Sequence, residues 1–174
     1  MRLRRKPWID EAIHDYDSHI ILSGQENYKG KWREAFSHPE RPLYMELGTG
    51  KGRFIAGMSE AHPDANFVGF EVQIGVIYYA AQKIFEAERD NAKVSLFDIA
   101  GIEEIVAPGE VDRFYINFCD PWPKAKHAKR RLTYHTFLDR YARLLKDNGE
   151  VHFKTDNEGL FMFSLEEFQN CGLE

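Results

Sequence analysis

The stretch "YMELGTGKG", from Tyr44 to Gly52, runs from an apolar segment into a glycine-rich turn, and it decides the fold. Its three glycines, Gly48, Gly50 and Gly52, stand at every second position, and an acid, Glu46, stands two residues ahead of the first. Because glycine has no Cβ, such a turn after a strand lets the backbone approach a ligand closely. We therefore expect a cofactor loop, with a plain structural turn as the alternative.

The spacing and the charge of this loop discriminate among three ligands. A mononucleotide phosphate loop needs G-x-x-x-x-G-K-[ST], which is absent here. A dinucleotide loop of the G-x-G-x-x-G type would place its third glycine at position 53, where the sequence has Arg53. Glu46 would repel a pyrophosphate but attract the ammonium and sulfonium groups of S-adenosylmethionine. The loop therefore predicts S-adenosylmethionine as cofactor.

Strand-like and helical segments alternate on both sides of this loop. Apolar runs rich in β-branched and aromatic residues predict strands at "PLYMEL", "NFVGFE", "KVSLFDI", "VDRFYINF" and "EVHFKTD". Helices are expected at about Arg53–Ala61, Gln73–Arg89, Ile102–Ala107, Thr133–Lys146 and Glu158–Asn170. This alternation predicts an α/β fold, a doubly wound and mostly parallel sheet with strand order 3-2-1-4-5.

The first forty residues hold few apolar runs and end at a proline-containing break, "SHPERP". We interpret residues 1–40 as an N-terminal basic arm of extended or short-helical chain, followed by one domain over residues 41–174. The arm carries Arg2, Arg4, Arg5 and Lys6, which could form a second basic patch or a solvated tail.

Composition bounds the class of protein. The chain has 174 residues, 43% of them apolar and 29% charged, as in an ordinary globular domain. No apolar run reaches the length of a membrane span, which is roughly 20 residues. The start, "MRLRRKPW", lacks the apolar segment of an export signal. Cys119 and Cys171 show no metal-ligand spacing. We expect a reduced, cytoplasmic protein without metal or membrane partner, either monomeric or homodimeric.

Two further acids follow the second and third predicted strands. Glu71 ends "NFVGFE", where such folds commonly place the acceptor for ribose hydroxyls. Asp98 follows "KVSLF" and could accept from an adenine amino group, although it could equally cap a helix or turn. Together with the glycine loop and Glu46, these acids predict an adenosine-shaped site.

The segment "FCDPWPKAKHAKRRLT" follows the fourth predicted strand. Pro121 and Pro123 make the turn that begins at Asp120 rigid, which suits a side chain that positions a substrate. Five cations follow within eight residues, in a chain of net charge -5, and we expect them to contact phosphates rather than form a solvated face. They are Lys124, Lys126, Lys129, Arg130 and Arg131, with His127 among them.

The last predicted strand ends in "KTDNEG". The polar residues there, Thr155, Asp156 and Asn157, could either cap the following helix or contact the substrate. Trp122 could stack on a base or pack beside the prolines.

The segments "ELGTGKGRF", "GFE", "NFCDPWPKAKHAKRRLT" and "HFKTDNEG" resemble the bacterial tRNA (guanine-N7)-methyltransferases, which modify a guanine in the variable loop. The resemblance implies a Rossmann-like class I methyltransferase fold and S-adenosylmethionine as cofactor. It implies cofactor contacts from Glu46, Glu71, Asp98 and Asp120, with Asp120 as the catalytic acid. It further implies tRNA as partner, with substrate contacts from Lys124 and Asp156 and RNA contacts from Lys126 through Arg131.

The family continues with a T-x-x-E motif beyond the last helix, whereas this sequence stops at "QNCGLE". We therefore expect the methyltransferase domain of residues 41–174 to be C-terminally truncated, without its last two strands and with "EVHFKTD" at an open edge. Two alternatives stand beside this interpretation. One is a non-catalytic RNA-binding module on the same fold. The other is an amino-group methyltransferase of nucleic acid. Such enzymes carry an Asp/Asn-Pro-Pro-aromatic turn, whereas in this sequence Trp122 separates the two prolines.

Overall fold

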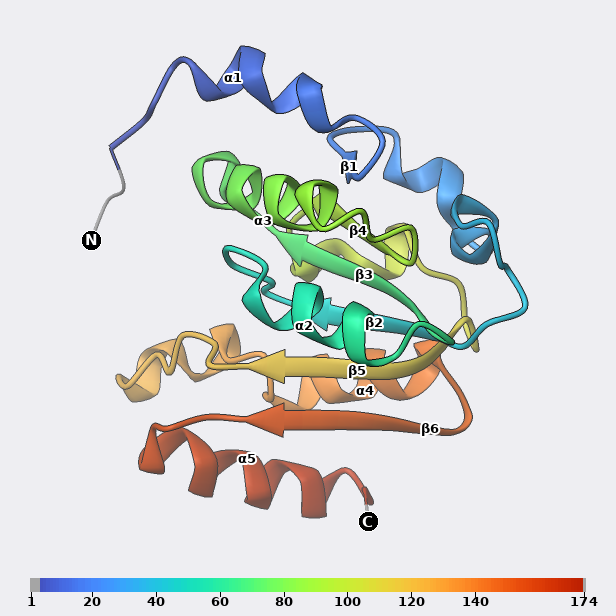
Figure 1. Cartoon of the computed structure of the whole chain (residues 1–174). Coiled ribbons are helices and arrows are strands. Elements are labelled where there is room, and N and C mark those ends of the chain that lie inside the picture. The colour runs from blue at the N-terminus through green and yellow to red at the C-terminus, as the bar shows by residue number, and fades with distance from the viewer. Residues whose placement is uncertain (1–3, 174) are drawn as a thin grey trace.

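The computed structural model describes residues 4–173. Within this range, six parallel strands form one twisted sheet in the order β1-β4-β3-β2-β5-β6 (Figure 1). The strands are β1 (Ile20–Ile21), β2 (Leu43–Leu47), β3 (Asn66–Glu71), β4 (Ala92–Leu96), β5 (Val111–Asn117) and β6 (Leu145–Lys154). The five strands expected from the sequence lie in the expected order 3-2-1-4-5. The expected number was wrong by one, because β1 adds a sixth strand beside β4.

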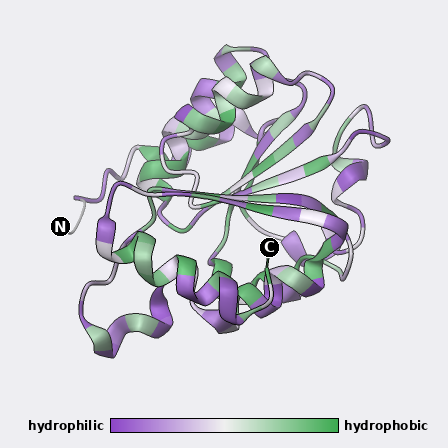
Figure 2. Cartoon of the chain, turned by 90° about the horizontal axis from the view of Figure 1, so that it is seen from below, coloured by the Kyte–Doolittle hydropathy of each residue, from purple (hydrophilic) through white to green (hydrophobic). Residues whose placement is uncertain are grey.

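Helices cover both faces of the sheet. On one face lie α1 (Ile9–Ala12), α2 (Arg53–Ala61) and α3 (Ile74–Glu86); on the other lie α4 (His135–Leu144) and α5 (Glu158–Asn170). Alternating strand residues feed the two cores, as Phe67 packs with the first group and Val68 with the second. The helices show both apolar and polar segments in Figure 2, as amphipathic helices on a sheet should.

The predicted bounds of α2 and α5 are confirmed, but the helix expected at Ile102–Ala107 is wrong. The chain instead forms a 3-10 helix, η4 (Ile99–Glu104), which begins three residues earlier. The reason is local: Asp98 accepts a hydrogen bond from the backbone N–H of Ala100 at 3.0 Å and starts the turn there.

The segment before β2 contributes to both cores. It contains η1 (Ile13–Tyr16), η2 (Gln25–Tyr28) and η3 (Trp32–Ala35), with Ile9, Ile13 and Trp32 almost fully buried. The Trp32 indole donates to the carbonyl of Ile105 at 2.7 Å. Arg2 lies outside the described residues.

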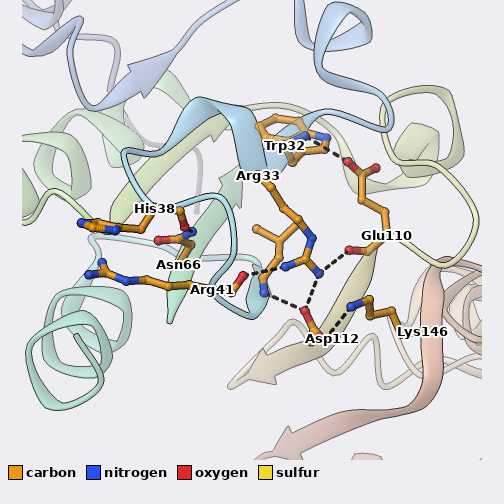
Figure 3. Close-up of polar contacts among 9 residues, drawn as sticks. Trp32, Arg33, His38, Arg41, Asn66, Glu110, Asp112 and Lys146 are labelled. Carbon is orange, nitrogen blue, oxygen red and sulfur yellow. Dashed lines mark hydrogen bonds and ion pairs between the residues drawn. The ribbon is translucent and has the colours of Figure 1, made fainter. Parts of the chain in front are cut away.

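A polar network ties this segment to the amino ends of β2 and β5 (Figure 3). Asp112 accepts from the Arg33 guanidinium at 2.6 Å and from the Leu43 backbone N–H at 2.8 Å, with Lys146 3.7 Å away. Burial alone would raise the pKa of Asp112, but the Leu43 N–H and the Arg33 charge outweigh it and lower that pKa. The network therefore fixes the end of the sheet opposite the glycine loop.

Among residues 4–173, no strand pairs with the outer side of β6, which is the expected open edge. Its pairing with β5 is interrupted, since Val111 faces Leu145 whereas Arg113 faces Glu150. Four residues of β6, 146–149, therefore stand against one residue of β5, and the pairing is irregular at this point.

Candidate active site

A cleft of about 700 Å³ opens at the carboxyl ends of the central strands. Ligands bind at this edge in sheets of this topology. Eight candidate site residues named from the sequence line the cleft. They are Gly48, Gly50, Glu71, Asp98, Asp120, Trp122, Lys129 and Arg130. Four separate segments of the chain, those following β2, β3, β4 and β5, therefore converge on one cavity.

The three glycines of the loop have different tasks. All have positive φ, at 85° for Gly48, 57° for Gly50 and 80° for Gly52. A Cβ on Gly48 or Gly50 would meet no atom within 4 Å, so these two leave room for a ligand. A Cβ on Gly52 would lie 2.8 Å from the Cα of Ala80, so this glycine lets α2 pack against α3. Gly52 does not line the cleft.

Glu46 lies behind the wall of the cleft, with 5% of its surface exposed. Its carboxyl accepts from the Thr49 hydroxyl at 2.6 Å and from the Asn117 amide at 3.5 Å. Burial raises the pKa of Glu46 to about 7. Gly69 makes this arrangement possible, since a Cβ there would lie 2.6 Å from the Thr49 hydroxyl. The side chain thus ties β2, the loop and β5 together.

Glu71 connects the glycine loop to the segment after β3. It accepts from the backbone N–H of Gly50 at 3.1 Å, and from those of Val72 and Gln73 at 3.1 and 3.2 Å. Its carboxylate therefore lines the cleft in a fixed orientation. Asp98 has the capping role described above and also lines the cleft, so the contact with an adenine amino group stays a prediction.

The turn at Asp120 is held in an uncommon backbone conformation. Phe118 and Trp122, on either side, have φ values of 51° and 43°. Non-glycine residues rarely adopt such values. Arg131 donates to the carbonyl of Pro121 at 3.2 Å and to that of Trp122 at 2.9 and 3.1 Å. Such strain persists only when surrounding contacts impose it, and Arg131 supplies those contacts at Trp122.

The basic run divides into three parts in the structure. Lys129 and Arg130, at the end of η5 (Ala125–Arg130), line the cleft, and Arg130 stacks on Trp122 at 4.9 Å. Lys124, Lys126 and His127 lie outside the cleft lining. Arg131 faces inward instead, as its guanidinium also lies 4.4 Å from the centre of the Phe163 ring.

Comparison with known proteins gives the family. A family model described as "Putative methyltransferase" matches residues 40–173. A tRNA (guanine-N(7)-)-methyltransferase of Bacillus licheniformis is 46% identical over 173 residues, which is 99% of this chain and 80% of that protein. The enzyme of that name from Bacillus subtilis is 45% identical over the same shares of the two chains. The chain belongs to the tRNA (guanine-N(7)-)-methyltransferase family.

Solved structures of low sequence identity share the fold of this family member. The tRNA (m1A58) methyltransferase TrmI from Aquifex aeolicus superposes with a TM-score of 0.55 at 16% identity, over 98% of this chain and 54% of that one. A precorrin-6y C5,15-methyltransferase from Geobacter metallireducens gives 0.61 at 12% identity, over 76% of this chain and 63% of that one. The Rossmann-like methyltransferase fold is therefore confirmed.

The remaining candidate residues from the sequence, Thr155, Asp156 and Asn157, lie after β6. Asn157 caps α5 by accepting from the backbone N–H of Leu160 at 2.8 Å, and the Thr155 hydroxyl accepts from the N–H of Asn157 at 3.1 Å. Asp156 is exposed and does not line the cleft. Capping is thus the observed role of Asn157, whereas the side chain of Asp156 faces solvent.

The sequence interpretation missed the apolar part of the cleft. Val72 and Phe118 are 60% and 58% exposed, which is unusual for such side chains, and both line the cavity together with Phe97 and Ile99. Asn117, which supports Glu46, lines it as well. The positions of these residues in the sequence could have identified them, because Val72 and Phe118 each directly follow a strand at its carboxyl end.

Within residues 4–173, no group of three His, Cys, Asp or Glu side chains is arranged to hold a metal ion. No helix of that part of the chain has the length and apolar character needed to cross a membrane.

Proposed function

We propose that this chain transfers a methyl group from S-adenosylmethionine to N7 of a guanine in the variable loop of tRNA. Membership of the family supports the reaction and the substrate. The observation that carries the proposal is the cleft, where carboxylates from three consecutive strand ends meet beside an exposed glycine backbone. Those carboxylates are Glu71, Asp98 and Asp120.

The cleft has the polar groups and the space that this cofactor requires. An ionised carboxylate accepts about four hydrogen bonds, so the three backbone bonds to Glu71 leave capacity for a ribose hydroxyl. Asp98 accepts one backbone bond and has capacity for an adenine amino group. Val72 and Phe97 offer apolar surface for the purine ring. From behind the loop, ionised Glu46 favours a cationic group at Gly48 and Gly50.

The reaction needs alignment more than proton transfer. S-adenosylmethionine supplies an activated methyl group on a cationic sulfur. Guanine N7 carries an in-plane lone pair at neutral pH, so no residue of the chain has to act as a general base. Asp120 orients the guanine through its N–H donors and places an anion near the positive charge that develops on the purine. The strained backbone at Phe118 and Trp122 supports this role, since it holds Asp120 in one position.

The basic run binds the RNA backbone next to the reacting base. Lys129 and Arg130 reach the cleft itself, and Trp122, stacked under Arg130, adds a flat surface for a base. Lys124, Lys126, His127 and Asp156 make further substrate contacts outside the cleft. These contacts are predominantly with phosphates and therefore depend on salt.

Methylation of bulk tRNA tests the proposal. The protein is incubated with tRNA and labelled S-adenosylmethionine, and the tRNA is then cleaved chemically at N7-methylguanine. We expect one cleavage position, in the variable loop. Calorimetry with S-adenosylmethionine separates the alternatives: absence of binding would establish the non-catalytic RNA-binding module. Incorporation of label without any such cleavage would establish methylation of an amino group.

A further inference from the structure

We propose that three lysines around Tyr79 form a second contact for the RNA backbone, across the cleft from the basic run. The three are Lys6, Lys51 and Lys83, and we call them the Tyr79 cluster. This inference rests on the proposed function, because it assigns part of the same substrate to a different surface of the protein.

Three distant parts of the chain bring the Tyr79 cluster together. The Lys6 ammonium donates to the Tyr79 hydroxyl at 2.9 Å and lies 5.3 Å from the ring centre. The Lys51 ammonium, from the glycine loop, lies 5.5 Å from the same ring centre. Lys83, one helical turn after Tyr79 on α3, donates to the backbone carbonyl of Lys51 at 2.9 Å. One aromatic side chain thus orders cations from the N-terminal segment and from the loop.

The positive charge of the cluster is not balanced nearby. In residues 4–173, no carboxylate forms an ion pair with Lys6, Lys51 or Lys83, whereas the neighbouring Arg5 is paired with Asp10 at 2.8 Å. All three lysines are exposed. An anion bound at the cluster would pair with these cations, in a chain whose net charge is -5.

The position of the cluster relative to the cleft favours RNA phosphates as that anion. Lys51 stands between Gly50, which lines the cleft, and Gly52, which packs against α3. In the strand order, β2 and β3 lie on one side of the central crevice, and β5, which precedes the basic run, lies on the other. A nucleotide in the cleft therefore has cations on both sides, as a continuous RNA backbone on either side of the target base requires.

The contacts of Lys6 add to this argument. A long, flexible lysine side chain loses conformational entropy when it is fixed against a ligand. The hydrogen bond to Tyr79 fixes Lys6 before any ligand arrives, so less entropy remains to be lost when a phosphate binds. The tyrosine is thereby a positioning residue for this lysine.

A comparison of two charge-matched variants tests the inference. The first carries Lys6→Gln, Lys51→Gln and Lys83→Gln. The control carries Lys29→Gln, Lys31→Gln and Lys146→Gln, which removes three exposed lysines that belong neither to the cluster nor to the cleft lining. Affinity for tRNA is measured over a series of salt concentrations, and affinity for S-adenosylmethionine is measured by calorimetry. Circular dichroism and thermal melting check that each variant is folded.

If each lysine contacts one phosphate, the first variant should lower the slope of log affinity against log salt by about 2, and the control should not change it. Tyr79→Phe should weaken tRNA binding at low salt, since it frees Lys6, without lowering cofactor affinity. An unchanged slope in the first variant would overturn the inference, and so would a loss of cofactor affinity in place of tRNA affinity. Failure of the wild-type protein to methylate tRNA would instead overturn the proposed function, so the two failures are distinguishable.

Discussion

Arg131 offers the sharpest test of how the site is built, because the sequence and the structure assign it different roles. The sequence places it in the RNA-binding run, whereas its guanidinium bonds the carbonyls of Pro121 and Trp122. We expect Arg131→Gln to impair the chemical step by releasing the turn that holds Asp120.

The size of the effect follows from the contacts. Hydrogen bonds from a charged group are worth about 1.5–3 kcal/mol each. The three bonds of Arg131 share one guanidinium at a partly exposed position. Their combined loss therefore costs about 2–3 kcal/mol. The strained backbone at Trp122 costs a comparable amount, about 1–3 kcal/mol. Without Arg131 the turn can therefore relax. A displacement of about 1 Å in a positioning group can lower a rate about 100-fold.

The assay compares kcat for tRNA methylation with the salt dependence of tRNA binding. Arg131→Gln should lower kcat by roughly 10- to 100-fold and leave the salt slope nearly unchanged. Arg131→Lys should restore kcat only poorly, since an ammonium cannot replace the guanidinium fork. Lys129→Gln is the matched control, and should lower the slope by about 0.7–0.9. If Arg131→Gln keeps its kcat and lowers the slope as much as Lys129→Gln does, the residue binds RNA and the structural argument fails.

Three further outcomes are expected. Glu71→Ala should weaken S-adenosylmethionine binding by more than the roughly 1 kcal/mol of a neutral hydrogen bond. The reason is that the lost acceptor is charged and also anchors Gly50. Unchanged affinity in calorimetry would show that Glu71 does not belong to the site. Burial raises the pKa of Glu46 from 4.5 to about 7, so the folded protein holds a proton that the unfolded chain releases between these values. The free energy of unfolding should therefore fall by up to about 3 kcal/mol as pH rises through this range, and denaturant titrations of Glu46→Gln should lack that fall. Joint replacement of Lys129 and Arg130 by Gln should lower the salt slope of tRNA binding without changing cofactor affinity, and equal slopes would indicate a solvated surface.

Local patterns in the sequence were enough to predict the architecture. Apolar runs and turn residues predicted the five long strands and the bounds of α2 and α5, and right-handed crossovers then restricted the strand order. The acids Glu71, Asp98 and Asp120 could be assigned to one cleft for the same reason. Residues that directly follow parallel strands must meet at one edge of the sheet, whatever the details of packing.

Tertiary structure decided what each side chain does at that edge. It put Glu46 behind the loop, turned Arg131 towards the backbone of Pro121 and Trp122, and brought Lys6 to Tyr79, 73 positions away in the sequence. It also added β1, a strand of only two residues, which is too short to show an alternating pattern. The physical reason is common to all of these. Period and composition report the local conformation of the chain, whereas the facing of a side chain and its partners depend on contacts between segments that only the folded chain brings together.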